Sequence, residues 1–248
     1  MTVNYNPRCV QDGLVFYVDA ANIRSYPRTG TTLFDTTEFG NNGTLTNGPS
    51  FSSQNGGLLS FDGIDDFVSV NSNSALNPTN AATIGSWVNF NSASINNRII
   101  FFGKGDGNTN ANTQYWLEKN ANNQFSTYFS IENTSKTLTP TNFIASSDTW
   151  YYFISSYDGS KLKIYINGVL IGSSTTFSGS ITTTNVVLGI GKLGSYSSLR
   201  LNGKIASSFI YNRALSDSEI WQNYNATRSR FEQAGSGSGG GGTGGGLG

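Results

Sequence analysis

Apolar residues recur in short runs along the chain, separated by polar or glycine-rich segments of a few residues. Many runs alternate apolar and polar positions, which is the period of a half-buried β-strand. Between two such runs, Asp158-Gly159-Ser160 and Asn167-Gly168 are typical of hairpin turns. The pattern predicts strands over residues 13–19, 57–61, 67–70, 83–91, 98–103, 114–118, 124–131, 150–157, 161–166, 169–172, 186–191 and 204–211.

One late segment predicts a helix instead. Ser216 and Glu219 form an S-x-x-E capping box ahead of an apolar run, so the helix should begin near Asp217 and end around Asn225 or a little later. No other helix alternates with the strands, which argues against a parallel α/β sheet. The expected fold is therefore all-β, an antiparallel two-sheet sandwich with one short helix near its C-terminal end.

The composition excludes several classes of function. Charged residues are 12% of the chain, about half the usual ~25%. Lysine and arginine equal aspartate and glutamate at 15 each, with no basic run, so we expect neither nucleic-acid binding nor membrane insertion. The chain contains no histidine, which excludes catalysis by a Ser-His-Asp triad or a Cys-His pair within it. Cys9 is the one cysteine, so no internal disulfide forms, and we expect it to pack near the N-terminus.

Seven blocks together carry a family resemblance. They cover residues 13–22, 41–51, 59–70, 82–90, 102–106, 150–172 and 201–220. In this order they resemble the LamG-like members of the concanavalin A-like lectin/glucanase jelly rolls. The resemblance implies two stacked antiparallel sheets with a concave face that often binds glycans. It leaves the function open, because this fold also hosts hydrolases and adhesion modules.

The acidic residues do not follow the pattern of the hydrolytic branch. Glucanases of the resembling family place carboxylates at alternate positions of one strand, whereas Asp62, Asp65 and Asp66 fall in a loop. We therefore predict that the protein is not an enzyme. These three residues, or Asp106, could instead ligate Ca²⁺, but aspartate beside glycine more often caps a turn. The prediction is no metal site and no cofactor, with Ca²⁺ as the open alternative.

Trp116 marks the most promising binding surface. In strand 114–118, Gln114, Trp116 and Glu118 share one face. In strand 124–131, Tyr128 lies on the polar face between two serines. If the two strands pair, Trp116 and Tyr128 form an aromatic platform on which a sugar stacks while polar neighbours bind its hydroxyls. The alternatives are that a loop covers this face or that it forms a protein interface.

The remaining tryptophans are expected to be structural. Trp87 and Trp150 lie in predicted strands of the resembling blocks, so we place them in the core. Trp221 lies in the predicted helix and should pack against the sandwich.

The place where the protein acts is inferred from a contrast between the family resemblance and other features of the sequence. The resembling domains are recognition modules, yet the N-terminus shows no export signal, and the chain is rich in Asn, Ser, Thr and Gly. Such sequences resemble bacteriophage fibre and capsid-decoration proteins. The prediction is a virion surface protein made in the host cytoplasm, a capsid decoration or head fibre or a tail adhesin, that binds glycans weakly and multivalently. The alternatives are a structural cement or collar protein, and a bacterial carbohydrate-binding protein exported without a signal.

The end of the chain suggests how it attaches. Residues 235–248 are of low complexity, and glycine allows close backbone approach. We therefore divide the chain into an arm (1–12), a jelly-roll domain (13–225) and the helix end with an attachment tail (226–248). Expected partners are other virion proteins and further copies of the chain. The residues assigned to partner attachment are Gly239, Gly240, Gly241, Gly242, Gly244, Gly245 and Gly246.

Overall fold

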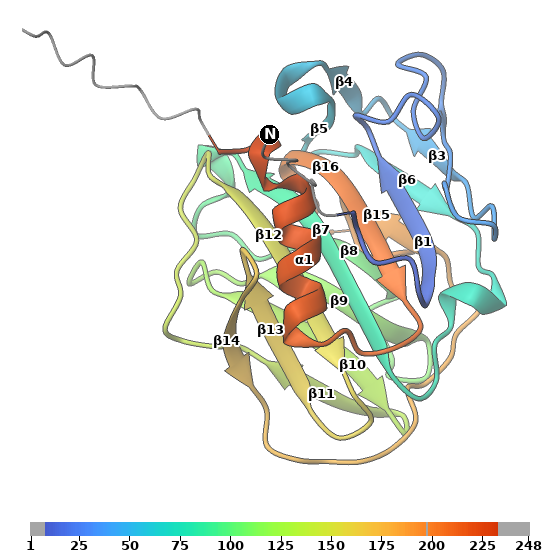
Figure 1. Ribbon diagram of the computed structural model, residues 1–248, viewed down its shortest axis with the longest axis vertical. Coiled ribbons are helices and arrows are strands. Elements are labelled where there is room, and N and C mark those ends of the chain that lie inside the picture. The colour runs from blue at the N-terminus through green and yellow to red at the C-terminus, as the bar shows by residue number, and fades with distance from the viewer. Residues whose placement is uncertain (1–7, 197, 233–248) are drawn as a thin grey trace, which may run out of the picture.

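Two antiparallel sheets packed face to face make up the protein (Figure 1). The computed structural model describes residues 8–196 and 198–232. Within these residues each sheet has eight strands, and one α-helix is present, so the predicted all-β sandwich is confirmed. The glycines assigned to partner attachment lie outside the described residues.

Sheet A contains the longest strands of the fold. Its order is β14-β13-β12-β7-β16-β5-β4, and β1 also pairs with β16. The hairpins from β12 to β14 match the prediction, because Asn167 and Gly168 both have the positive φ angles of a tight hairpin turn. The strands are β1 (Leu14–Asp19), β4 (Ser50–Ser52), β5 (Leu58–Asp62), β7 (Ala82–Phe90), β12 (Trp150–Tyr157), β13 (Leu162–Ile166), β14 (Val169–Ser173) and β16 (Asn202–Tyr211).

Sheet B has the order β11-β10-β9-β8-β15-β6-β3-β2. The strands are β2 (Thr32–Leu33), β3 (Gly43–Thr46), β6 (Phe67–Val70), β8 (Ile99–Gly105), β9 (Thr113–Lys119), β10 (Phe125–Ile131), β11 (Thr134–Leu138) and β15 (Leu188–Ile190). Four short strands of the two sheets, β2, β3, β4 and β11, were not predicted. They lie at or next to sheet edges and lack clear apolar alternation, so pairing with a neighbour defines them.

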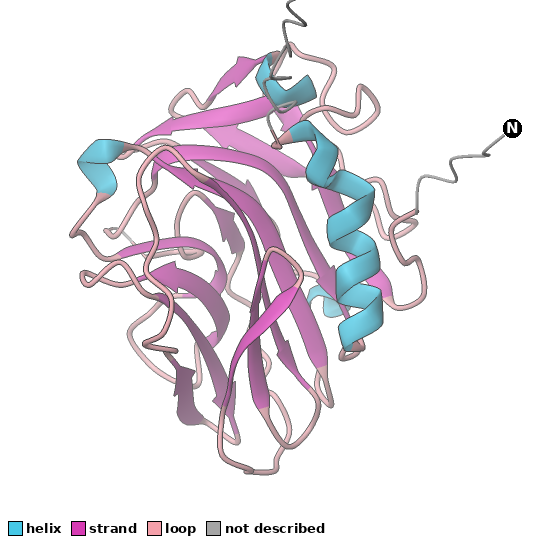
Figure 2. Cartoon of the chain, turned by 60° about the vertical axis from the view of Figure 1, so that its left-hand side comes forward, coloured by secondary structure: helices cyan, strands magenta, loops and turns pink. Residues whose placement is uncertain are grey.

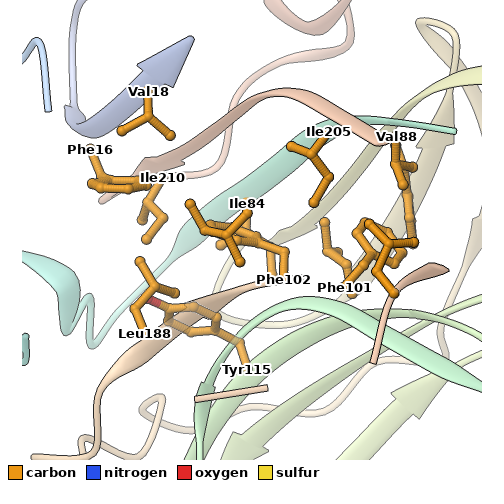
Figure 3. Close-up of a cluster of buried hydrophobic side chains, with 14 of the residues drawn as sticks. Phe16, Val18, Ile84, Val88, Phe101, Phe102, Tyr115, Leu188, Ile205 and Ile210 are labelled. Carbon is orange, nitrogen blue, oxygen red and sulfur yellow. The ribbon is translucent and has the colours of Figure 1, made fainter. Parts of the chain in front are cut away.

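The main core fills the space between the sheets. Side chains at alternate positions of β7, β12 and β16 meet those of β8, β9 and β10. Figure 3 shows part of this core, in which Ile84 and Ile205 of sheet A face Phe102 of sheet B. Phe153 of sheet A packs against Phe101 and Phe125 of sheet B, with ring centroids 5.8 and 4.7 Å apart. Burial of this contiguous apolar surface is the dominant stabilising contribution.

A second apolar cluster lies on the outer face of sheet A, under helix α1 (Asp217–Thr227). Figure 2 shows α1 lying along the outside of this sheet. Ser216 caps the helix in the predicted capping box with Glu219, and the predicted bounds are confirmed. Trp87 is buried under the helix and Trp150 is half-buried against Phe231.

Four 3-10 turns complete the fold, namely η1 (Gln54–Gly56), η2 (Ser74–Leu76), η3 (Ser92–Ser94) and η4 (Arg228–Arg230). Trp221 is less buried than expected. It packs over the Gly168 turn and Tyr224, but 45% of its surface stays exposed. Cys9 is partly buried at the N-terminal end of the described chain, and burial, with Asp19 nearby, raises the pKa of its thiol to about 11.

Candidate functional site

The candidate site lies on the outer face of sheet B, on the hairpin of β9 and β10. Tyr115 and Leu117 of β9 point into the core, so Trp116 and Glu118 point outward, as the alternation predicts. Strand β10 pairs with β9 in the register that places Tyr128 directly opposite Trp116. The predicted pairing of the two aromatic residues is therefore confirmed.

The two rings stack on each other. Their centroids are 3.9 Å apart and their planes differ by 4°. Tyr128 is only 4% exposed, and its hydroxyl donates to Asn110 Oδ1 at 2.7 Å, while burial raises its pKa. A flat platform formed by both rings is thus not what the fold builds. Trp116 is the partly exposed member of the pair, and the buried ring of Tyr128 packs against one face of its indole.

A carboxylate also holds the indole nitrogen of Trp116 in place. Glu118 Oε2 accepts hydrogen bonds from Trp116 Nε1 at 2.9 Å and from Arg98 Nη2 at 2.7 Å and Nε at 3.1 Å. The Arg98 guanidinium lies 5.9 Å from the centre of the Trp116 ring, within reach of a cation–π contact. Glu118 Oε1 makes no hydrogen bond to a described residue, so this oxygen is left to accept one from a ligand.

A glycine on the neighbouring strand brings a loop close to the tryptophan. Gly103 of β8 lies opposite Trp116, and a Cβ atom there would come within 2.6 Å of Trp116 Cβ and 2.9 Å of Leu193 Cδ1. Gly194 N–H donates to Gly103 O at 3.2 Å. Because position 103 has no side chain, the loop around Leu193 packs onto the sheet and borders the site.

The loop on the other border is shaped by Asp106. Its Oδ1 accepts the backbone N–H groups of Asn108 and Thr109 at 2.9 and 3.4 Å. Burial alone would raise the pKa of Asp106, but these hydrogen bonds outweigh it and lower the pKa. Asp106 therefore forms the turn that presents Asn110 to Tyr128, which is the turn chemistry weighed against Ca²⁺ binding.

Gln114 does not belong to the exposed surface. It is fully buried, and its Nε2 donates to Pro78 O at 3.2 Å. Alternation places the residue on the outward face of β9, but the segment after η2 covers this end of the sheet. Gln114 therefore presents no surface to a glycan.

Asp62, Asp65 and Asp66 do gather their carboxylates, with oxygens within 4.8 Å of one another. Asp62 Oδ1 accepts the N–H groups of Ile64, Asp65 and Asp66 in its own turn, which lowers its pKa. Burial and the two neighbouring charges raise the pKa of Asp66. These hydrogen bonds explain the cluster as an aspartate-capped turn. Some of its carboxylate oxygens are already engaged and are therefore not available to a cation.

Two residues of the site escaped sequence reasoning. Arg98 immediately precedes β8, and Asn110 lies in a polar loop with no distinguishing pattern. Their roles arise from contacts to residues 18 to 20 positions away. For Arg98, the one indication in the sequence was its position: extending the alternation of β8 by one residue places this polar side chain on the outward face.

An antiparallel two-sheet jelly roll with one short helix is the fold of lectin-like domains of the concanavalin A type. The chain belongs to the concanavalin A-like lectin/glucanases superfamily, because residues 61–221 match the profile of its Laminin_G_3 family. No curated protein matched the sequence. Among the described residues, no helix has the length and apolar character needed to cross a membrane.

Solved structures share the fold at low sequence identity. The binding domain of Paraclostridial Mosquitocidal Protein 1 is 16% identical, with a TM-score of 0.67 over 86% of this chain and 52% of that one. Domain 4 of AbnA, a GH43 extracellular arabinanase from Geobacillus stearothermophilus in complex with arabinotriose, is 18% identical, with a TM-score of 0.64 over 87% and 100% of the chains. The botulinum neurotoxin serotype D ligand binding domain, in complex with N-acetylneuraminic acid, is 14% identical, with a TM-score of 0.64 over 86% and 50%. This chain thus spans about half of the toxin domains.

Proposed function

We propose that the protein is a non-catalytic module that binds glycans through Trp116 on the outer face of sheet B. The observation that carries this proposal is the fixation of a partly exposed indole by Tyr128 on one face and by Glu118 at its nitrogen. A ring held in this way loses little conformational freedom when a sugar packs against it. The complexes of arabinotriose and N-acetylneuraminic acid with proteins of this fold are in keeping with the proposal.

The groups around Trp116 suit sugar hydroxyls. Glu118 Oε1 is an acceptor, and Thr137 on β11, in the same cross-strand row as Tyr128, is an exposed hydroxyl. A shallow surface with one aromatic contact binds a single sugar weakly, so display in many copies would supply the useful affinity. Catalysis is not part of the proposal, because the carboxylate of Glu118 is already engaged by Arg98 and by Trp116.

The setting we propose is the surface of a bacteriophage virion, as a capsid decoration, head fibre or tail adhesin. The support is the Asn-, Ser-, Thr- and Gly-rich, histidine-free composition and the glycine tail over residues 235–248. The tail would bind partner backbones through its own N–H and C=O groups, leaving the sandwich displayed. A chain lacking residues 235–248 should fold normally and fail to join its assembly. Normal incorporation of the shortened chain would refute attachment through the tail.

Trp116→Ala tests glycan binding directly. On a glycan array, the variant should lose most of the signal of the wild-type chain, because one stacked aromatic contributes about 1 kcal/mol, which multivalency amplifies. Trp221→Ala is the matched control, since Trp221 is also an exposed tryptophan but lies on helix α1 at the opposite face. Equal binding by the wild-type and both variants would place any glycan site elsewhere. The absence of binding to every glycan by the wild-type chain would refute the proposed function.

A further inference from the structure

Two neighbouring strands of sheet B, β3 and β6, bring a pair of polar loops together (Figure 1). Gly43, the first residue of β3, pairs with Val70, the last residue of β6. Residues 40–42, which lead into β3, and residues 71–73, which follow β6, therefore leave the sheet side by side. A cavity of about 270 Å³ opens between them, and four of its six lining residues are asparagine. The lining residues are Gly40, Asn41, Asn42, Asn71, Ser72 and Asn73.

Asp35 holds the first of these loops in one conformation. This residue is 8% exposed, and its carboxylate accepts the backbone N–H groups of Tyr17 and Asn41 at 3.0 and 2.9 Å. The Asp35 N–H in turn donates to Asn42 Oδ1 at 3.0 Å. Because these hydrogen bonds fix both asparagines before a ligand arrives, little conformational freedom is lost when one binds.

Asn41 contributes a hydrogen-bond acceptor at the wall of the cavity. The residue is only 6% exposed, and it lines the cavity. Its Nδ2 donates to Val15 O at 3.5 Å, which orients the amide, and its Oδ1 forms no hydrogen bond with a described residue. Burial thus fixes the position of an oxygen that can accept a hydrogen bond from a ligand hydroxyl.

Two further asparagines contribute donors. Asn42 Oδ1 accepts the Asp35 N–H, and Asn73 Oδ1 accepts the Ala75 N–H at 2.9 Å. In both amides the oxygen is engaged, whereas Nδ2 forms no hydrogen bond with a described residue. A cation needs oxygen ligands and would find two of these oxygens occupied. A hydroxyl group both donates and accepts, so adjacent sugar hydroxyls match the Asn41 acceptor and the two Nδ2 donors together.

An exposed aromatic ring lines the next cavity along the same two segments. This cavity measures about 330 Å³, and its lining includes Phe39, which precedes Gly40, and Ser74, which follows Asn73. Phe39 is 43% exposed, so its ring offers a sugar an apolar surface that the amide groups lack. Pockets for small molecules measure roughly 300–1,000 Å³, so the two cavities together accommodate about one sugar residue. The other lining residues are Val15, Ala75, Asn77, Pro78, Thr79, Asn80 and Asn212.

The charges near this surface favour a neutral ligand. No charged side chain lines either cavity. Asp35 lies behind the first loop, and Lys104 lies behind the second, where its Nζ donates to Ser72 Oγ at 3.1 Å. Lys104 is fully buried, so a ligand in the cavity cannot contact it. An acidic or basic ligand would therefore lose hydration here without gaining a direct counter-charge.

We infer that residues 39–42 and 71–74 form a second glycan site, beyond the one proposed at Trp116, and that it binds a neutral sugar residue. One hydroxyl donates to Asn41 Oδ1, neighbouring hydroxyls accept from the Nδ2 groups of Asn42 and Asn73, and the apolar face of the sugar packs toward Phe39. Strands β8 and β15 lie between β9 and β6 in sheet B, so the second site is separate from Trp116.

Titration of the isotope-labelled full chain with single sugars tests this site by NMR. Glucose, galactose, mannose, arabinose and N-acetylglucosamine are the neutral probes, and glucuronic acid is the charged comparison. At least one neutral sugar should shift the side-chain amide signals of Asn42 and Asn73 and reach saturation. The side-chain signals of Asn22, which lines neither cavity, should stay in place.

Isosteric variants measure what each donor contributes. Asn42→Asp and Asn73→Asp keep the oxygen that accepts a backbone N–H and remove only the Nδ2 donor. Each should weaken binding of the active sugar about fivefold, as expected for the loss of one hydrogen bond, with the other amide as the reporter. Asn22→Asp is the matched control, because Asn22 Oδ1 also accepts a backbone N–H, that of Arg24 at 3.0 Å. It adds the same charge outside the cavities and should leave binding unchanged.

A second pair of variants examines the aromatic contact. Phe39→Ala should weaken binding about threefold, because the sugar loses the ring against which it packs. Phe34→Ala is its control, since Phe34 is 39% exposed and lines neither cavity. Melting temperatures show whether each variant is folded. An unchanged affinity in Phe39→Ala would overturn the role assigned to its ring.

The outcomes separate this site from the one at Trp116. The absence of shifts at Asn42 and Asn73 with all five neutral sugars overturns the second site and leaves the array test of Trp116 to decide the proposed function. Larger shifts with glucuronic acid overturn the assignment to a neutral ligand. Equal weakening by Asn22→Asp would mean that overall charge controls binding, which also overturns the site. Saturable shifts that persist in Trp116→Ala support a second, independent site.

Discussion

The outer face of each sheet carries a tryptophan in the middle of a strand, but one of these tryptophans is buried and the other stays partly exposed. On sheet A, Trp87 is 2% exposed, stacks on Phe231 at 4.0 Å and donates from Nε1 to Thr227 Oγ1 at 2.9 Å. On sheet B, Trp116 stacks on Tyr128 and donates to Glu118, but it stays partly exposed. An aromatic residue that points out of a sheet is therefore core or surface according to what covers it.

The residues around each tryptophan explain why helix α1 covers Trp87 and no helix covers Trp116. Around Trp87, the outward positions include Tyr152 and Phe209, so helix α1 gains apolar burial by lying across them. Around Trp116, the outward positions of β10 are Ser126 and Ser130 beside Tyr128. Both hydroxyls are buried and hydrogen-bonded, that of Ser126 to Thr139 and that of Ser130 to Asn110 O, so their burial is compensated. Polar loops rather than a helix therefore cover this face, and Trp116 remains partly exposed.

Trp87→Ala should give the largest change in stability. We expect the free energy of unfolding to fall by about 3–5 kcal/mol, because a buried indole is lost and a cavity remains. Trp116→Ala should cost clearly less, since part of its indole already contacts water. Urea denaturation of both variants checks the comparison. Equal losses would mean that both outer faces act as core.

Gly103→Ala examines how closely the site is packed. The added Cβ would lie 2.6 Å from Trp116 Cβ and 2.8 Å from Tyr115 O, so the backbone or the loop must shift. We expect a destabilisation of about 1–3 kcal/mol together with weaker glycan binding. The melting temperature and the glycan array provide the measurements. An unchanged melting temperature would show that the loop around Leu193 yields easily.

Ser216→Ala weakens the helix that covers sheet A. Ser216 Oγ accepts the Glu219 N–H at 3.3 Å, and loss of such a cap costs about 1 kcal/mol. Urea denaturation should show this loss without any change in glycan binding, because α1 lies on the face opposite Trp116. A change in binding would indicate that the two outer faces are coupled.

The smallest effect is expected from pH and the Arg213–Glu219 ion pair beside the same cap. Hydrogen bonds from Arg213 at 2.6 and 2.9 Å lower the pKa of Glu219 to about 2 from its usual 4.5. The stabilisation is therefore complete above pH 4.5 and is lost as the pH falls toward 2. Glu219→Gln should lower stability at pH 7 by about 0.5 kcal/mol, since both side chains are 28% exposed, and should make no difference near pH 2. A pH-independent difference would assign the effect to packing.

The sequence by itself determined which side chains share a face. Alternation in β9 and β10 placed Tyr115 and Leu117 inward and Trp116 and Tyr128 outward, because successive side chains of a strand point to opposite sides. The S-x-x-E pattern likewise fixed the start of α1, since capping is a local interaction.

The tertiary structure decided what covers each face. It stacked Trp116 on Tyr128, buried Gln114 under the segment after η2, and brought Arg98 and Asn110 to the site. It also formed β2, β3, β4 and β11, whose sequences carry little β-pattern. These features depend on contacts between residues distant in the chain, and a local pattern of residue types contains no information about such contacts.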